Sequence, residues 1–205
     1  MTHQITQPLW QPSVKNINAT NMLYFTQQLE CQLGLVFNDY QQLHQWSVDQ
    51  PEKFWQQIWL FSEIRASRLA DQVLTNADQF PGAKWFSGAR LNYAENALRN
   101  RSDKTALISR LENGSRKTLS YADLYQQVAE CAAALRQSGI VAGDRVAGFM
   151  PNIPETIVAM LATASIGAVW SSCSPDFSIN GVMDRFGQIQ PKILFCCDGY
   201  FYNGK

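Results

Sequence analysis

A polar turn in the last third of the chain carries the side chains best suited to bind a ligand. Residues 171–176 read Ser-Ser-Cys-Ser-Pro-Asp, directly after a strand of small residues and before a helix that we expect near Ile179. Ligands of open α/β sheets bind at the carboxyl ends of strands, so this turn lies where we expect a ligand. A second interpretation stays open, in which Ser174 and Asp176 only cap the following helix.

Other residue types argue against several catalytic chemistries. The 5 cysteines are odd in number and none forms a C-x-x-C pair, which excludes the usual zinc and redox motifs. The only histidines are His3 and His44, so Cys173 has no histidine in the later part of the chain to activate it as a nucleophile. Neither a Walker A motif nor a G-x-G-x-x-G following a strand is present. The residues alone assign no catalytic group and no metal ligand.

Composition restricts the class of partner. Lys plus Arg and Asp plus Glu number 17 each, so no overall field favours nucleic acid or an anionic membrane. No stretch approaches the roughly 18 apolar residues of a membrane span, and the first residues lack the basic start and apolar core of a secretory signal. Unpaired cysteines fit a reducing compartment, so we expect a cytoplasmic protein that binds small molecules.

The second half of the chain alternates strand and helix patterns. We expect strands over 105–111, 116–119, 145–150, 168–171 and 192–197. An Asn113-Gly114 hairpin turn joins the first two. Ser120 and Asp123 form a capping box for the helix that follows, and further helices are expected from Pro154 and from Ile179. Strands alternating with helices predict an α/β fold with a parallel-type sheet, flanking helices and one hairpin.

The first hundred residues predict a helical lobe. They hold five of the 6 tryptophans. Helices are expected over 19–33 and 38–46, and a third begins at Pro51, with Phe54, Ile58 and Phe61 on one face. An aromatic stripe at helical spacing is usually core. Residues 79–98 are expected to be an ordered connector, with a short helix near Asn92.

Several motifs resemble the adenylate-forming acyl-CoA synthetases. Residues 119–124, Leu-Ser-Tyr-Ala-Asp-Leu, are similar to the first core motif of that superfamily, and residues 164–169 to its second. Two longer stretches, 85–96 (WFSGARLNYAEN) and 170–177 (WSSCSPDF), together with DRFGQI at 184–189, resemble the narrower family of acetoacetate–CoA ligases (acetoacetyl-CoA synthetases). The resemblance begins near residue 36 and extends to the end of the chain.

The resemblance implies a two-step reaction. Acetoacetate attacks the α-phosphate of ATP with Mg²⁺ bound, which yields an acetoacetyl-adenylate and pyrophosphate, and the thiol of coenzyme A (CoA) then displaces AMP. The family performs it with a Gly/Ser/Thr-rich phosphate loop, an Asp that binds adenine and ribose, and a Lys on a mobile C-terminal domain. None of the three is expected within residues 1–205, so we expect this chain alone to be inactive, with no catalytic residue of its own.

The resemblance also implies a coenzyme contact. In related acetyl-CoA synthetases the turn aligned with Ser174, Pro175 and Asp176 borders the pantetheine tunnel of CoA, and the basic position aligned with Lys205 meets its 3′-phosphate. Tyr202 stands where a second arginine is expected. Arg185 is expected to form a structural ion pair.

Three segments are expected along the chain. Residues 1–35 form an N-terminal extension, 36–100 an N-terminal helical lobe with its connector, and 101–205 the first part of an AMP-binding domain that stops before the phosphate loop. Two alternatives stay open. The chain could be a non-catalytic truncated or split-gene product that interacts with a separate chain carrying the remaining domains. It could also belong to a ligase for another short acid, such as acetate or propionate.

Overall fold

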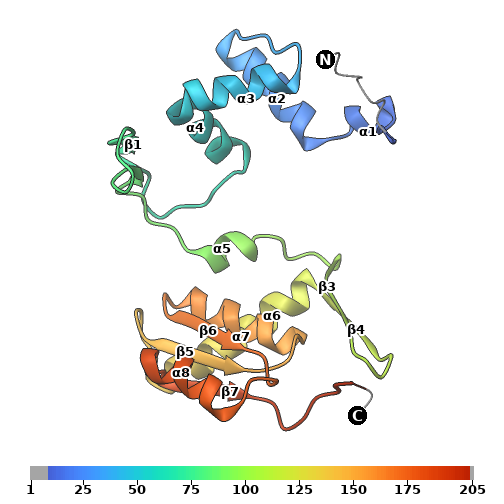
Figure 1. Ribbon diagram of the computed structural model, residues 1–205, viewed down its shortest axis with the longest axis vertical. Helices are drawn as coiled ribbons and strands as arrows, with labels where there is room; N and C mark the ends of the chain where they lie inside the picture. The colour runs from blue at the N-terminus through green and yellow to red at the C-terminus, as the bar shows by residue number, and fades with distance from the viewer. Residues whose placement is uncertain (1–8, 204–205) are drawn as a thin grey trace, which may run out of the picture. The chain divides into compact units, whose positions relative to one another are not determined.

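The computed structural model describes residues 9–203, which fall into two compact units. Unit 1 comprises residues 9–64 and 69–89, and unit 2 comprises residues 65–68 and 90–203. Within the described range, no helix combines the length and apolarity that crossing a membrane demands. Figure 1 labels most elements of both units.

Unit 1 consists of four helices and two short strands. They are α1 (Val14–Asn18), α2 (Asn21–Leu33), α3 (Tyr40–Asp49), α4 (Pro51–Phe61), β1 (Gln72–Thr75) and β2 (Lys84–Ser87), with β1 and β2 antiparallel. The three longer helices confirm the predicted ones. Their starts follow local chemistry: the side chains of Thr20 and Asp39 accept backbone N–H groups of α2 and α3, and Pro51 opens α4.

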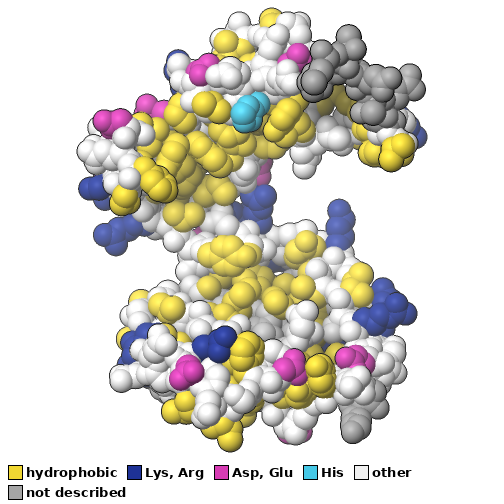
Figure 2. All heavy atoms as spheres, viewed as in Figure 1, with side chains coloured by type: hydrophobic (Ala, Val, Ile, Leu, Met, Phe, Trp, Pro, Cys, Tyr) yellow, Lys and Arg dark blue, Asp and Glu magenta, His cyan; other side chains and the backbone are white. Residues whose placement is uncertain are grey.

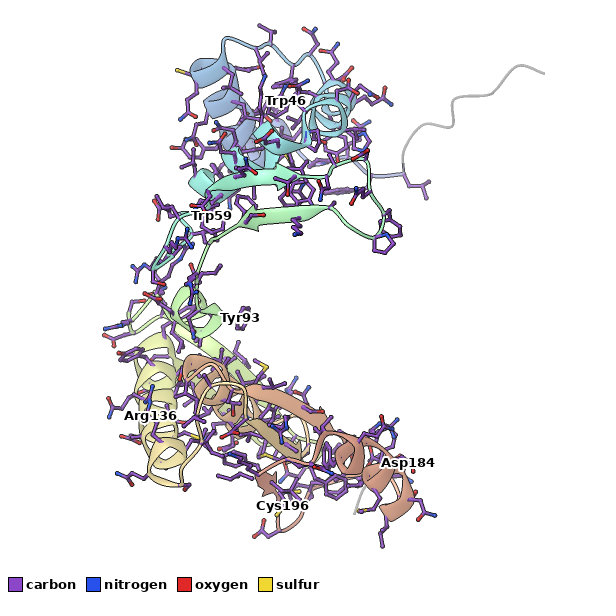
Figure 3. The ribbon with its side chains drawn as sticks, turned by 90° about the vertical axis from the view of Figure 1, so that its left-hand side faces the viewer. Trp46, Trp59, Tyr93, Arg136, Asp184 and Cys196 are labelled. Atoms are coloured by element: carbon purple, nitrogen blue, oxygen red, sulfur yellow. The ribbon has the colours of Figure 1, made fainter. Side chains whose placement is uncertain are left out.

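Aromatic side chains build the core of unit 1. Phe25, Leu29 and Leu43 are buried, and the predicted stripe of Phe54, Ile58 and Phe61 on α4 packs against them. Trp46 also joins this cluster, and Figure 3 shows it among the helices. The stripe is therefore core, as its spacing predicted.

Part of unit 1 leaves large apolar side chains in solvent. Trp55 is 45% exposed, Leu60 57% and Trp85 45%. Hydrophobic side chains gather on the face of unit 1 that Figure 2 shows. Such a surface is more apolar than the scattered single residues of most protein surfaces.

The strands β1 and β2 correct the sequence prediction for this region. Residues 79–98 were expected to be an ordered connector without a strand, but Leu74 pairs with Trp85 and Thr75 with Lys84. The strands have four residues each and pair across a loop, so no local hydrophobic alternation marks them.

Unit 2 contains the α/β region. Its elements are α5 (Tyr93–Ala97), β3 (Thr105–Arg110), β4 (Arg116–Ser120), α6 (Tyr121–Gln137), β5 (Arg145–Phe149), α7 (Pro154–Ser165), β6 (Val169–Cys173), α8 (Ile179–Ile189) and β7 (Ile193–Cys196). Strands β3 and β4 form an antiparallel hairpin, and β6, β5 and β7 form a parallel sheet in that order. The predicted parallel-type sheet, flanking helices and hairpin are confirmed.

Helices cover both faces of the parallel sheet. Along β5 the side chains alternate, so Val146 joins one buried cluster and Ala147 another. The Val146 cluster contains apolar residues of α6 and α7, including Leu135 and Leu161, whereas the Ala147 cluster contains Phe186 of α8. The connections that leave β5 and β6 therefore lead to opposite faces of the sheet.

Local contacts secure the helices that support the sheet. The Ser120 side chain accepts the N–H of Asp123, and the Asp123 carboxylate accepts the N–H of Ser120, which confirms the predicted capping box. Asn92 caps α5 and also donates its amide to the carbonyl of Ala164 at the end of α7, at 2.9 Å. The segment around Asn92 is thus attached to the α/β region.

Candidate functional site

The carboxyl ends of β5, β6 and β7 lie at one edge of the parallel sheet and are each followed by a polar segment. Pro151 and Asn152 follow β5, Ser174 to Asp176 follow β6, and Asp198 to Tyr200 follow β7. Because the connections after β5 and β6 diverge to opposite faces, this edge has the topology at which open α/β sheets bind ligands. The turn identified from sequence lies at this edge.

The turn is held by a compact hydrogen-bond network. The Ser174 hydroxyl donates to Oδ2 of Asp176 at 2.7 Å and accepts the Asp176 N–H at 3.4 Å. The Tyr200 hydroxyl donates to Oδ1 of the same carboxylate at 2.7 Å. The N–H of Phe177 donates to the Ser174 carbonyl at 3.2 Å and closes the turn. Both carboxylate oxygens of Asp176 are therefore engaged.

These bonds shift the acidity of both partners. The Tyr200 hydroxyl, and next that of Ser174, lower the pKa of the Asp176 carboxyl. Hydrogen bonding to that carboxylate raises the pKa of Tyr200 to about 12. Asp176 therefore stays ionised and Tyr200 stays protonated around neutral pH, the states in which a tyrosine donates to a carboxylate.

The interpretation that Ser174 and Asp176 cap the following helix is wrong, because another residue caps it. Helix α8 begins at Ile179, as predicted, but its N-cap is Ser178, whose side chain accepts the N–H of Gly181. Ser178 has the extended backbone of an N-cap, and Ser174 and Asp176 lie outside that reach. Their polar groups bond to each other and to Tyr200 instead of to the helix.

Cys173 and Arg185 have structural surroundings. Cys173 is buried at the end of β6, and this burial raises the pKa of its thiol, which disfavours the thiolate that a nucleophile needs. Arg185 lies over the ring of Phe177 at 4.0 Å and donates to the carbonyl of Gly181. Its expected ion pair is wrong: no carboxylate of residues 9–203 forms a salt bridge with it. The guanidinium instead makes a cation–π contact beside the turn.

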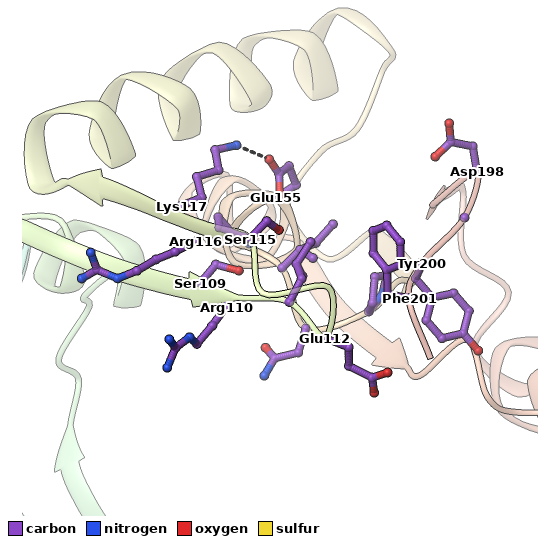
Figure 4. A pocket seen from close by; sticks show the side chains of 16 residues that line it. Ser109, Arg110, Glu112, Ser115, Arg116, Lys117, Glu155, Asp198, Tyr200 and Phe201 are labelled. Atoms are coloured by element: carbon purple, nitrogen blue, oxygen red, sulfur yellow. Dashed lines mark hydrogen bonds and ion pairs between the residues drawn. The ribbon is translucent and has the colours of Figure 1, made fainter. Parts of the chain in front are cut away.

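A pocket of 820 Å³ lies at the same edge, next to the hairpin. It is bounded by the hairpin end, the first residues of α7 and the segment that contains Tyr200 and Phe201. Figure 4 shows Lys117 of β4 directed toward Glu155 of α7, with which it forms an ion pair at 2.5 Å. A volume of this size falls in the range of small-molecule sites.

The structure describes three of the four predicted contact residues. Ser174, Pro175 and Asp176 are brought together in one turn, whereas Lys205 lies outside the described residues. Tyr200 is the residue that sequence reasoning missed as part of this turn. Its bond to Asp176 joins residues 24 apart in the chain, so no local spacing marks it.

Two family models match the chain. The model described as "AMP-binding enzyme" matches residues 94–203, and the model described as "Acetyl-coenzyme A synthetase N-terminus" matches residues 40–97. The residues that the first model matches include the parallel sheet, the turn and Tyr200.

Curated relatives and a solved structure match nearly the whole chain. An acetoacetyl-coenzyme A synthetase of Rhizobium meliloti (strain 1021) is 45% identical over 202 residues, which are 98% of this chain and 31% of the relative. A malonamoyl-CoA synthetase of Penicillium aethiopicum is 40% identical over 96% of this chain and 28% of its own length. The structure of an acetoacetyl-CoA synthetase from Streptomyces lividans has a TM-score of 0.91 and 44% identity over 97% of this chain and 31% of that one. The chain thus spans about 30% of the length of the proteins it matches.

Proposed function

The chain belongs to the AMP-binding enzyme family, and from that membership we propose that it forms part of an acid–thiol ligase acting on acetoacetate. In the proposed reaction the acetoacetate carboxylate attacks the α-phosphate of ATP and releases pyrophosphate, and the CoA thiol then displaces AMP to give acetoacetyl-CoA. The observation that carries the proposal is the similarity, in both sequence and backbone, to the Streptomyces lividans acetoacetyl-CoA synthetase.

We further propose that this chain contributes a coenzyme contact and not the ATP-handling groups. Ser174, Pro175 and Asp176 would border CoA, with Lys205 pairing with its 3′-phosphate. The position of the turn at the carboxyl edge of the sheet supports this contact, and so does its freedom from capping α8. In residues 9–203 no group of His, Cys, Asp or Glu side chains fits a metal ion, so we assign no step through Mg²⁺ to these residues.

Two alternatives rest on specific observations. The Penicillium aethiopicum relative is named for a different acid, which favours keeping other short acids as substrates of the proposed ligase. Each of the outer strands β6 and β7 is paired only with β5 in the described part of the chain, so each has an edge that could pair with a further segment or a separate chain.

The unpaired cysteines support a reducing compartment, which we propose is the cytoplasm.

Replacing the matched third of the Streptomyces lividans enzyme with this chain is expected to give an active ligase. The surfaces that this third presents to the rest of the enzyme should be compatible, so kcat/KM for acetoacetate should stay within about tenfold of the parent value. The measurement is acetoacetyl-CoA formation from acetoacetate, ATP and CoA.

The matched control is the same replacement with the corresponding region of an acetyl-CoA synthetase, which should be much less active because its buried contacts differ. A folded replacement enzyme that forms no acetoacetyl-CoA would contradict the proposed function. Supplying the chain separately, together with the remaining two thirds, tests the separate-chain alternative in the same assay.

A further inference from the structure

Tyr200 connects two loops that the chain places on opposite sides of the central strand. Asp176 follows β6, and Tyr200 follows β7, while β5 lies between these two strands in the sheet. The hydrogen bond between Tyr200 and Asp176 therefore spans the carboxyl end of β5. Among residues 9–203, it is the one side-chain hydrogen bond that ties the turn after β6 to the segment after β7.

Without this bond, the hydrogen bonds of the Ser174 and Asp176 side chains would all be local. The Ser174 hydroxyl and carbonyl bond to Asp176 and Phe177, at separations of two and three residues. Such local bonds allow a turn to move as a body about its ends. A bond from a distant segment to the Asp176 carboxylate fixes its orientation relative to the sheet.

The chemistry of the pair favours a persistent bond. A neutral hydroxyl donating to a carboxylate at 2.7 Å makes a charge-assisted bond, stronger than one between two neutral groups. Both oxygens of Asp176 accept from hydroxyls, which leaves the carboxylate one favoured orientation. The lowered pKa of Asp176 and the raised pKa of Tyr200 keep both groups in the states that this bond requires.

We propose that Tyr200 is a positioning residue that holds the Ser174–Pro175–Asp176 turn, through Asp176, in the orientation that receives coenzyme A. The inference rests on the proposed CoA contact of that turn. It assigns Tyr200 no contact with the reacting atoms: the hydroxyl acts only through the carboxylate of Asp176.

The test compares Tyr200→Phe with Tyr202→Phe in the 205-residue chain. The two tyrosine rings lie 6.1 Å apart on the same segment, but the Tyr202 hydroxyl makes no hydrogen bond with any described residue. Two quantities are measured: amide hydrogen exchange at Asp176 and Phe177 by NMR, and the Kd for CoA by calorimetry. Both amides belong to the turn, so their exchange reports its order directly.

Tyr200→Phe is expected to speed exchange at both amides by roughly threefold to tenfold, as loss of one hydrogen bond implies, and to weaken CoA binding by a similar factor. Tyr202→Phe should leave exchange at both amides unchanged, because its hydroxyl does not bond to the turn. In an Asp176→Ala background, Tyr200→Phe should have no further effect, which separates action through Asp176 from a general loss of packing.

Unchanged turn exchange in Tyr200→Phe would overturn the proposal, and so would faster exchange with an unaltered Kd for CoA. A different result would overturn the proposed CoA contact alone. If the unsubstituted chain binds no CoA while Tyr200→Phe still speeds exchange in the turn, the coenzyme assignment fails, but Tyr200 still positions the turn.

Discussion

The 205 residues by themselves are expected to release no pyrophosphate from ATP and acetoacetate. Adenylation requires several groups that stabilise charge on the transferring phosphate. The resemblance implies that a Gly/Ser/Thr-rich phosphate loop, an Asp and a Lys on a C-terminal domain supply these groups, and none of the three is expected within residues 1–205. The chain also spans only about 30% of the acetoacetyl-CoA synthetases it matches. A coupled pyrophosphate assay at saturating ATP and acetoacetate checks the expectation.

The replacement enzyme described above provides the positive control for this assay, because it contains the same residues together with the remaining two thirds of a ligase. Pyrophosphate release by the isolated chain that saturates with acetoacetate would show that the ATP-handling groups lie within these residues, against the proposal.

Leu161→Ala is expected to lower the free energy of unfolding of unit 2 by about 2–5 kcal/mol. Leu161 is 4% exposed and lies in the cluster where α6 and α7 pack against Val146 of the central strand. Truncation removes buried methyl groups and leaves a cavity that rigid neighbouring helices fill only in part. The measurement is hydrogen exchange of the slowest amides in β5, since unit 1 does not contribute to that signal.

Leu194→Ala is the matched control for this substitution. Leu194 lies on the edge strand β7 and is 50% exposed, so the same truncation should cost less than about 1 kcal/mol. Equal losses for the two variants would contradict the packing of α7 on the sheet, because they would mean that Leu161 is no more buried than Leu194.

The sequence predicted those parts of unit 2 that depend on neighbouring residues. The capping box of Ser120 and Asp123, the hairpin at Asn113-Gly114 and the start of α8 at Ile179 follow from groups within four residues of one another. Alternating strand and helix patterns were enough to predict a parallel sheet, because the short connections allow few other arrangements. These local signals also placed the turn at the carboxyl end of a strand.

Features that depend on distant partners could not be predicted in this way. The strands β1 and β2 exist because Leu74 pairs with Trp85 across a loop, and four-residue strands have too few positions to show alternation. The second interpretation of Asp176, as a helix cap, was wrong for the same reason. A carboxylate near a helix start suggests a cap, but Ser178 fills that position, and Tyr200 provides the partner of Asp176 from the segment after β7.

The most direct test of the coenzyme assignment separates the two half-reactions in the replacement enzyme. Ser174→Ala and Asp176→Ala are introduced together, with Ser138→Ala at the far end of α6 as the control. ATP–pyrophosphate exchange in the absence of CoA reports adenylation, and thioester formation at varied CoA reports the second step. We predict that the KM for CoA rises about tenfold or more, a loss of roughly 1.4 kcal/mol of binding, while the exchange rate stays near that of the control. An unchanged KM for CoA, or an equal fall in both half-reactions, would contradict the assignment of this turn to coenzyme A.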